Sequence, residues 1–209
     1  MSRRRRPPVL ASLLLGMTLG IGVMTPTAGD MPTYQITLDP ARTEVSFSLG
    51  ALFHTVQGRG VPRAATLDFA PEEGLLTGSV ILAAAGLTTE NESRDKKMQE
   101  EVLKSPIHPD IVLELKRAEG PFDPETGGDL QVEASLHLLG KSHPVSFPLE
   151  VTILMDEEGG FRAKGAFMVP YVAWGLKDPS KVFLRVDKEV QVSFSTAGTM
   201  RVTPPPPGP

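Results

Sequence analysis

The chain contains no cysteine among its 209 residues. This absence excludes disulfides, thiolate zinc sites, iron–sulfur clusters and a cysteine nucleophile. Two standard catalytic motifs are missing as well. There is no G-x-S-x-G nucleophile elbow, and Gly140-Lys141-Ser142 does not complete a phosphate-binding loop, because Ser135 stands where that loop needs glycine. The protein is therefore not expected to be an enzyme.

The side chains that usually bind metals are poorly spaced for that purpose. The four histidines form no H-x-H or H-x-x-x-H pair. His137 and His143 flank a turn and could approach each other across a hairpin, although solvent-facing histidines are the better interpretation. Adjacent acids such as Glu157 and Glu158 point in different directions and are interpreted as solvated charge. We expect no metal and no cofactor.

Basic residues are scarce outside the first 29 residues. Those 29 residues hold four of the 21 basic side chains and none of the 25 acidic ones, so the remaining 17 basic and 25 acidic residues give a net charge of −8. Nucleic-acid binding needs a basic face. We expect no nucleic-acid partner.

Residues 1–29 have the composition of a secretory signal peptide. Four arginines at positions 3–6 precede an apolar stretch over residues 9–24, and the small residues Thr27, Ala28 and Gly29 follow. We expect cleavage after Ala28 or Gly29, and a periplasmic or secreted protein. An uncleaved anchor is the alternative, although the stretch is shorter than the ~20 residues of a spanning helix. The tail over residues 204–209, rich in proline, is expected to be disordered.

From Thr33 onward, apolar residues alternate with polar ones at the period of two that strands require. The 20 glycines and 20 prolines supply turns between these runs. The expected strands cover residues 34–38, 45–49, 67–69, 76–85, 111–116, 130–139, 147–153, 161–169, 182–186 and 190–194. Many strands without helices between them indicate an all-β sandwich or closed barrel. We predict one domain over residues 33–203, an extended antiparallel barrel of about eight to nine strands with one short helix.

The short helix is predicted over residues 93–104. Ser93 is the expected N-cap, and Met98 and Val102 lie four residues apart on one face. Such a helix could close one end of the barrel or cross its surface, and both options stay open.

Aromatic and small residues together raise the question of whether the barrel is hollow. Nine phenylalanines fall mostly on the inward side of the strands, where ordinary core packing would account for them. Ala83, Ala85, Ala134 and Gly165 are small residues at inward positions and would leave room. An eight-stranded barrel either fills with side chains or holds one small ligand.

Five segments, taken in order, resemble the YceI-like family of polyisoprenoid-binding proteins. They are YQITLDPARTEVSF over residues 34–47, LTTENESRD over 87–95, SPIHPDIVL over 105–113, LHLLGKSHPV over 136–145 and WGLKDPSKVF over 174–183. The resemblance extends over residues 33–203. It implies a lipocalin-like β-barrel with a helix and a long apolar tunnel, and a lipid ligand such as a polyisoprenoid, an isoprenoid quinone precursor or a fatty amide.

The candidate site follows from that tunnel. Residues expected in its wall are Phe47, Leu49, Phe53, Phe69, Leu113, Leu136, Phe147, Phe167, Trp174 and Phe183; the alternative for each is plain core. Arg94, with Asn91 and His54, is expected to hold a polar head group. The alternative for Arg94 is a local ion pair with Asp95 or Glu90.

The sequence is compatible with three functional hypotheses. The first is a periplasmic carrier for a long apolar lipid, with membrane contact that is transient or made through an uncleaved signal. The second is a structural or interaction module of the envelope with a filled barrel and no ligand. The third and weakest is an enzyme acting on a lipid held in the barrel. The oligomeric state is left open, with a homodimer as one option.

Overall fold

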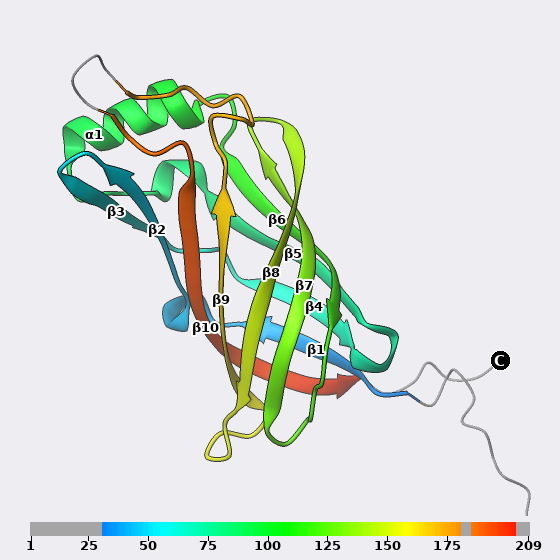
Figure 1. Ribbon diagram of the computed structural model, residues 1–209. Coiled ribbons are helices and arrows are strands. Elements are labelled where there is room, and N and C mark those ends of the chain that lie inside the picture. The colour runs from blue at the N-terminus through cyan, green and yellow to red at the C-terminus, as the bar shows by residue number, and fades with distance from the viewer. Residues whose placement is uncertain (1–30, 181–184, 204–209) are drawn as a thin grey trace, which may run out of the picture.

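A computed structural model describes residues 31–180 and 185–203. Ten strands make up most of it (Figure 1). Their bounds are β1 (Thr33–Leu38), β2 (Glu44–Ala51), β3 (His54–Gly60), β4 (Ala65–Ala70), β5 (Leu75–Ala83), β6 (Asp110–Glu119), β7 (Gly127–Leu138), β8 (Lys141–Ile153), β9 (Gly160–Val169) and β10 (Val190–Thr203). The expected signal peptide and the expected proline-rich tail lie outside the described residues. Within the described part, no helix is long and apolar enough to cross a membrane.

Eight of the ten strands close into an antiparallel barrel. Their order around the wall is β1, β4, β5, β6, β7, β8, β9 and β10, and β10 pairs with β1 to complete the circle. Closure leaves these strands without unpaired edges. The predicted all-β barrel with one helix is confirmed.

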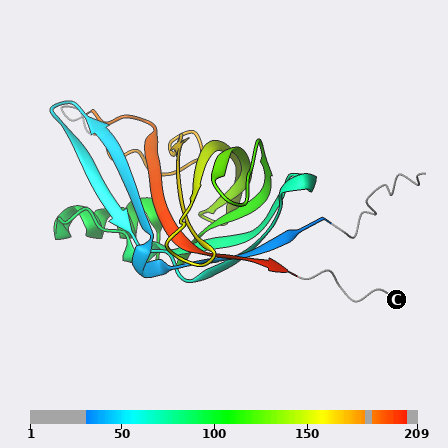
Figure 2. The same ribbon diagram turned by 90° about the horizontal axis from the view of Figure 1, so that it is seen from below.

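Strand β10 shares one of its edges between two partners. Residues 191–195 pair with residues 44–48 of β2, and residues 198–203 pair with residues 33–38 of β1. A single 3-10 turn, η1 (Pro40–Arg42), carries the chain from β1 to β2. As a result β2 and β3 form a hairpin that projects beyond the closed wall (Figures 1 and 2).

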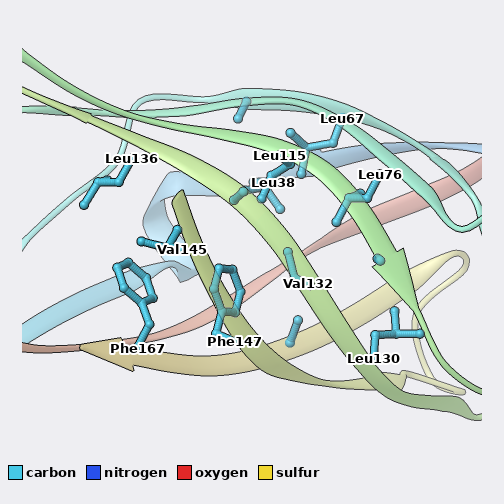
Figure 3. Close-up of a cluster of buried hydrophobic side chains, with 14 of the residues drawn as sticks. Leu38, Leu67, Leu76, Leu115, Leu130, Val132, Leu136, Val145, Phe147 and Phe167 are labelled. Carbon is cyan, nitrogen blue, oxygen red and sulfur yellow. The ribbon is translucent and has the colours of Figure 1, made fainter. Parts of the chain in front are cut away.

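Strand β7 illustrates why alternation predicts the core. Its apolar residues at even positions from 130 to 138 are at most 7% exposed, whereas Gln131 and Glu133 between them are exposed. Side chains from the other strands point into the barrel in the same way (Figure 3). Burying one such leucine or phenylalanine stabilises a fold by roughly 1.5–3 kcal/mol.

Several strand predictions differ from the structure, and β10 runs nine residues beyond its predicted end at residue 194. Strand β3 was not predicted, because Val56 is its only aliphatic residue and glycines occupy two of its positions. The predicted strand over residues 182–186 falls mostly outside the described residues, and Val186 makes only an isolated bridge to Ala51.

The helix begins earlier than predicted. Helix α1 (Glu92–Lys97) starts after Asn91, whose side-chain oxygen accepts a hydrogen bond from the backbone N–H of Arg94 at 2.9 Å. The expectation that Ser93 is the N-cap is therefore wrong. Asparagine and serine both cap helices well, so the position where α1 begins depends on which of the two residues adopts an extended backbone.

The helix continues as a π-helical segment, η4 (Met98–Leu103), and ends at Lys104, which has a left-handed backbone (φ 50°). Leu103 is buried, and Met98 and Val102 pack against the barrel core as their spacing predicts. The helix lies across one end of the barrel (Figure 1). Its apolar side chains therefore cover part of that end.

Candidate functional site

The interior of the barrel is hollow. It holds a cavity of about 640 Å³ whose wall takes residues from all ten strands. The lining is almost entirely aliphatic and aromatic, because inward positions of the alternating strands converge on it (Figure 3). Pockets for small molecules commonly measure about 300–1,000 Å³. The cavity is thus large enough for one ligand and suits an apolar one.

Packed aromatic rings form the middle of the wall. The Phe147 ring stacks on Phe167 with centroids 5.2 Å apart and meets Phe194 edge-on at 5.6 Å. A Cβ atom on Gly165 would lie 2.6 Å from Cζ of Phe194, so this glycine makes room for a ring and not for a ligand. The four small residues expected to leave space are absent from the lining: Ala83, Ala85, Ala134 and Gly165. The space comes from the circumference of eight strands.

Three aromatic rings close the end opposite the helix; we call them the floor. Tyr34 and Phe69 lie on neighbouring strands, and Phe122 comes from the β6–β7 connection. Phe122 meets Phe69 edge-on at 5.0 Å and Tyr34 at 6.1 Å between centroids. Two backbone hydrogen bonds between Asp123 and Gly127 hold this connection tightly, at 2.7 and 2.9 Å. The floor is therefore apolar and closely packed.

The helix end of the cavity is polar; we call it the rim. Its residues are His54, Asn91, Ser93, Arg94 and Lys97. Four of them are exposed to solvent as well as lining the cavity, so the cavity reaches the surface here. Among the described lining residues no carboxylate occurs, and the two charged side chains are the cations Arg94 and Lys97.

Arg94 is held in place by Thr89. Its Nε donates to the Thr89 hydroxyl at 2.7 Å, and its Nη2 donates to the Thr89 carbonyl at 2.9 Å. The alternative of a local ion pair is not what the structure has. Glu90 pairs with Arg59 at 2.8 Å, and within the described part no carboxylate pairs with Arg94. These two bonds leave other guanidinium N–H groups for a ligand.

Asp95 fixes the segment that carries Thr89. Its carboxylate accepts hydrogen bonds from the Thr88 hydroxyl at 2.7 Å, from the Thr89 N–H at 2.8 Å and from the Thr89 hydroxyl. Burial raises the pKa of Asp95, but the hydrogen bonds from Thr89 and Thr88 and the charge of Arg94 outweigh it and hold the pKa below its ordinary value. The chain Asp95–Thr89–Arg94 therefore orients the guanidinium before any ligand arrives.

The described parts of the connection between β9 and β10, residues 170–180 and 185–189, cross the same end of the barrel, and we call them the late loop. Tyr171, Leu176, Pro179 and Val186 from this loop line the cavity. The Tyr171 hydroxyl donates to the Asp187 carbonyl at 2.9 Å. Burial, together with nearby carboxylates, raises the pKa of Tyr171 to about 12, so this hydroxyl stays protonated.

Contacts with the hairpin and the helix hold the late loop. The backbone N–H of Asp187 donates to the Gly50 carbonyl at 2.8 Å, and that of Leu52 donates to the Arg185 carbonyl at 3.1 Å. Lys177 bonds to Glu101 of η4. Within the loop, hydrogen bonds from Lys188 and Ser180 lower the pKa of Asp178 to about 2. These ties link three segments around the rim.

Most predicted site residues do meet in the cavity. Those in the lining are Phe47, Leu49, Phe69, Leu113, Leu136, Phe147 and Phe167 in the apolar wall, and Arg94, Asn91 and His54 at the rim. Phe183 lies outside the described residues. Contact of any of these side chains with a ligand stays a prediction.

Phe53 and Trp174 are not in the lining. Phe53 occupies the turn between β2 and β3 and is 87% exposed, because a residue beyond the end of a strand no longer follows its alternation. The Trp174 ring stacks on His143 at 4.1 Å between centroids. Burial and the charge of Lys141 lower the pKa of His143. This pair fastens the late loop to β8.

Sequence reasoning missed several lining residues. Lys97 follows Arg94 by three residues, and helical spacing alone places both on one face. Leu176 and Tyr171 belong to an irregular loop, where no periodicity marks an inward position. The less favoured alternative, an approach of His137 and His143 across the hairpin, is not what the structure has. His137 bonds to Glu114 at 2.9 Å, whereas His143 stacks on Trp174. No group of three or more potential metal ligands occurs in the part of the chain that the structure describes.

An eight-stranded antiparallel barrel around an apolar cavity defines a class of small-ligand-binding barrels to which the lipocalins belong. This chain shares the closed-barrel architecture of that class. More narrowly, it belongs to the YceI-like domain family, whose model matches residues 36–197.

Solved structures share the fold at low sequence identity. BcnA of Burkholderia cenocepacia is 15% identical with a TM-score of 0.64, and the match covers 78% of this chain and 99% of BcnA. A polyisoprenoid binding domain from Saccharophagus degradans is 13% identical with a TM-score of 0.62, covering 79% and 98% of the two chains. A YceI protein of Campylobacter jejuni is 17% identical with a TM-score of 0.55, covering 72% and 86%. No curated protein matches the sequence.

Proposed function

We propose that the protein is a periplasmic binding or carrier protein for a long apolar lipid. The observation that carries this proposal is the apolar cavity of about 640 Å³ inside the closed barrel. A filled interior would have favoured the alternative, a structural module without a ligand. The periplasmic location rests on the signal-like residues 1–29.

The chemistry of the wall favours an acyl or polyprenyl chain. Transfer of each methylene from water into such a wall is worth about 0.8 kcal/mol, so ten would supply about 8 kcal/mol before the cost of ordering the ligand. The domain from Saccharophagus degradans that shares this fold is described as polyisoprenoid binding. That description supports an isoprenoid chain as the first ligand to test.

The rim favours a lipid with a hydrogen-bonding or anionic head. Arg94 is oriented by Thr89, and Lys97 follows on the next turn of α1. A charged hydrogen bond to a guanidinium is stronger than a neutral one. The head group therefore meets Arg94 while the chain extends toward the floor.

Binding and not catalysis is the function these groups support. A hydrolytic reaction on the lipid would need a nucleophile with a base or a metal beside it. The described lining residues carry hydroxyls at Thr43, Thr89, Ser93, Tyr171 and Thr196. Thr43 and Thr196 bond to each other at 2.7 Å, and the Tyr171 hydroxyl donates to the Asp187 carbonyl. The Thr89 hydroxyl is already engaged by both the Asp95 carboxylate and the Arg94 guanidinium.

The test is native mass spectrometry of the protein after export, followed by organic extraction and lipid identification. A one-to-one adduct of a long-chain lipid that is lost on extraction is the expected result. Protein that carries no adduct and takes up neither polyprenyl nor acyl lipids would overturn the proposal.

A further inference from the structure

The turn between β2 and β3 exposes two adjacent apolar side chains. Leu52 is 58% exposed and Phe53 is 87% exposed. Two-residue hairpin turns usually hold glycine, asparagine or aspartate, which suit water and the turn backbone. Here both positions hold large apolar residues at the tip of the hairpin that projects from the barrel (Figure 2).

This turn lies directly beside the rim. The residues that flank it, Ala51 and His54, both line the cavity. The turn is also ordered by its neighbours, since the N–H of Leu52 donates to the Arg185 carbonyl at 3.1 Å. The exposed pair is therefore held at the place where the cavity reaches the surface.

Positive charge accompanies the apolar pair at this end. Arg94, Lys96 and Lys97 lie on α1, and within the described part none of them forms an ion pair. Glu92 and Asp95 on the same helix offset two of these charges, so α1 keeps one net positive charge. A surface of apolar tip and unpaired cations matches the boundary of a bilayer, where acyl chains lie beneath anionic head groups.

We propose that the Leu52–Phe53 turn inserts into a phospholipid bilayer containing anionic lipid and brings the rim against the membrane. Contact of this kind would let an apolar ligand pass between bilayer and cavity without crossing water, where each exposed methylene is unfavourable. This purpose rests on the proposed function, but insertion of the turn does not and can be measured separately.

The experiment uses two matched tryptophan variants of the exported protein, Phe53→Trp and Met155→Trp. Met155 is 97% exposed in the β8–β9 connection, at the far end of the barrel (Figure 1). Each variant is mixed with vesicles of phosphatidylcholine with a minority of phosphatidylglycerol, with and without brominated acyl chains. Trp174 contributes equally to both. Blue-shifted emission and quenching by bromine at position 53, but not at 155, are expected.

A second measurement uses Leu52→Ser/Phe53→Ser in vesicle flotation. Loss of both apolar side chains should lower the partition coefficient about tenfold or more, whereas Met155→Ser should leave it unchanged. Equal quenching at positions 53 and 155, or no quenching at either, would overturn the proposal.

The result is distinguishable from failure of the carrier function. Binding of a soluble short-chain fluorescent lipid without vesicles tests the cavity alone. Insertion of the turn without lipid uptake would reject the carrier function and support the membrane contact. Lipid uptake without insertion would support the carrier function and reject the membrane contact.

Discussion

The two ends of the barrel differ in the contacts that hold them together. The floor is made of three packed rings, and its connection is tied by backbone hydrogen bonds between Asp123 and Gly127. The rim is formed by α1, η4 and the late loop, and the contact between η4 and the loop is the exposed ion pair of Glu101 with Lys177. Exposed ion pairs contribute little stability, and segments with few buried contacts open first. The floor should therefore preserve the fold, while the rim admits the ligand.

The largest expected difference between the ends is in stability. Phe69 is 3% exposed and touches both other floor rings, so Phe69→Ala should lower the free energy of unfolding by about 3–5 kcal/mol. The matched change at the rim end, Phe53→Ala, should stay within about 0.5 kcal/mol, because that ring is exposed. Denaturant unfolding of both variants measures the contrast. Similar losses would mean that the two ends do not differ in this way.

Between the ends, the wall should tolerate charge on only one face of β9. Phe167 points into the cavity, whereas Met168 is 48% exposed on the outside. Phe167→Arg should weaken lipid binding by about a hundredfold or more, since it places a cation among apolar side chains. Met168→Arg is the control and should bind normally. Circular dichroism checks that both variants fold. Unchanged binding by folded Phe167→Arg would remove this stretch from the site.

At the rim the expected effect is smaller and selective. Arg94→Ala should weaken a lipid with an anionic head by about tenfold and leave a neutral hydrocarbon of equal length unaffected. Lys96→Ala on the same helix removes a charge that does not line the cavity and should change neither affinity. Titration with the two ligands gives the comparison. Equal losses for both would reject a head-group role for Arg94.

The smallest effect concerns pH. The lowered pKa of His143, caused by burial and Lys141, means that the folded protein prefers the neutral ring. The unfolded chain takes up its proton near pH 6.5, so stability due to this residue should fall as pH decreases through that value toward the folded pKa. His143→Gln should make stability depend less on pH in this range. Melting temperatures between about pH 8 and about pH 5 measure it. A variant whose melting temperature changes with pH as steeply as that of the wild type would show that His143 does not cause the dependence.

Alternation predicted the barrel because each inward residue obeys the same geometry. It placed Leu113, Leu136 and Phe147 on the inward side of their strands, where the structure has them in the cavity wall, while the tunnel itself was implied by the family resemblance. It failed where the chain leaves that geometry. Phe53 lies past the end of a strand, and Trp174 belongs to a loop with no period.

The hollow interior could not be predicted from the same pattern. Filled and empty barrels present the same inward residues, and the difference depends on how far across the barrel the side chains reach. The small residues chosen as signs of space were a poor guide. Gly165 instead accommodates the Phe194 ring.

Strand β10 has a consequence for how such proteins diverge. Its C-terminal half pairs with β1 and closes the barrel, whereas its N-terminal half pairs with β2 and supports the β2–β3 hairpin. A hairpin that is lengthened, shortened or given a new tip alters only the second half. The hairpin can therefore change in sequence and length while the closed barrel stays intact, and solved structures at 13–17% identity share the fold.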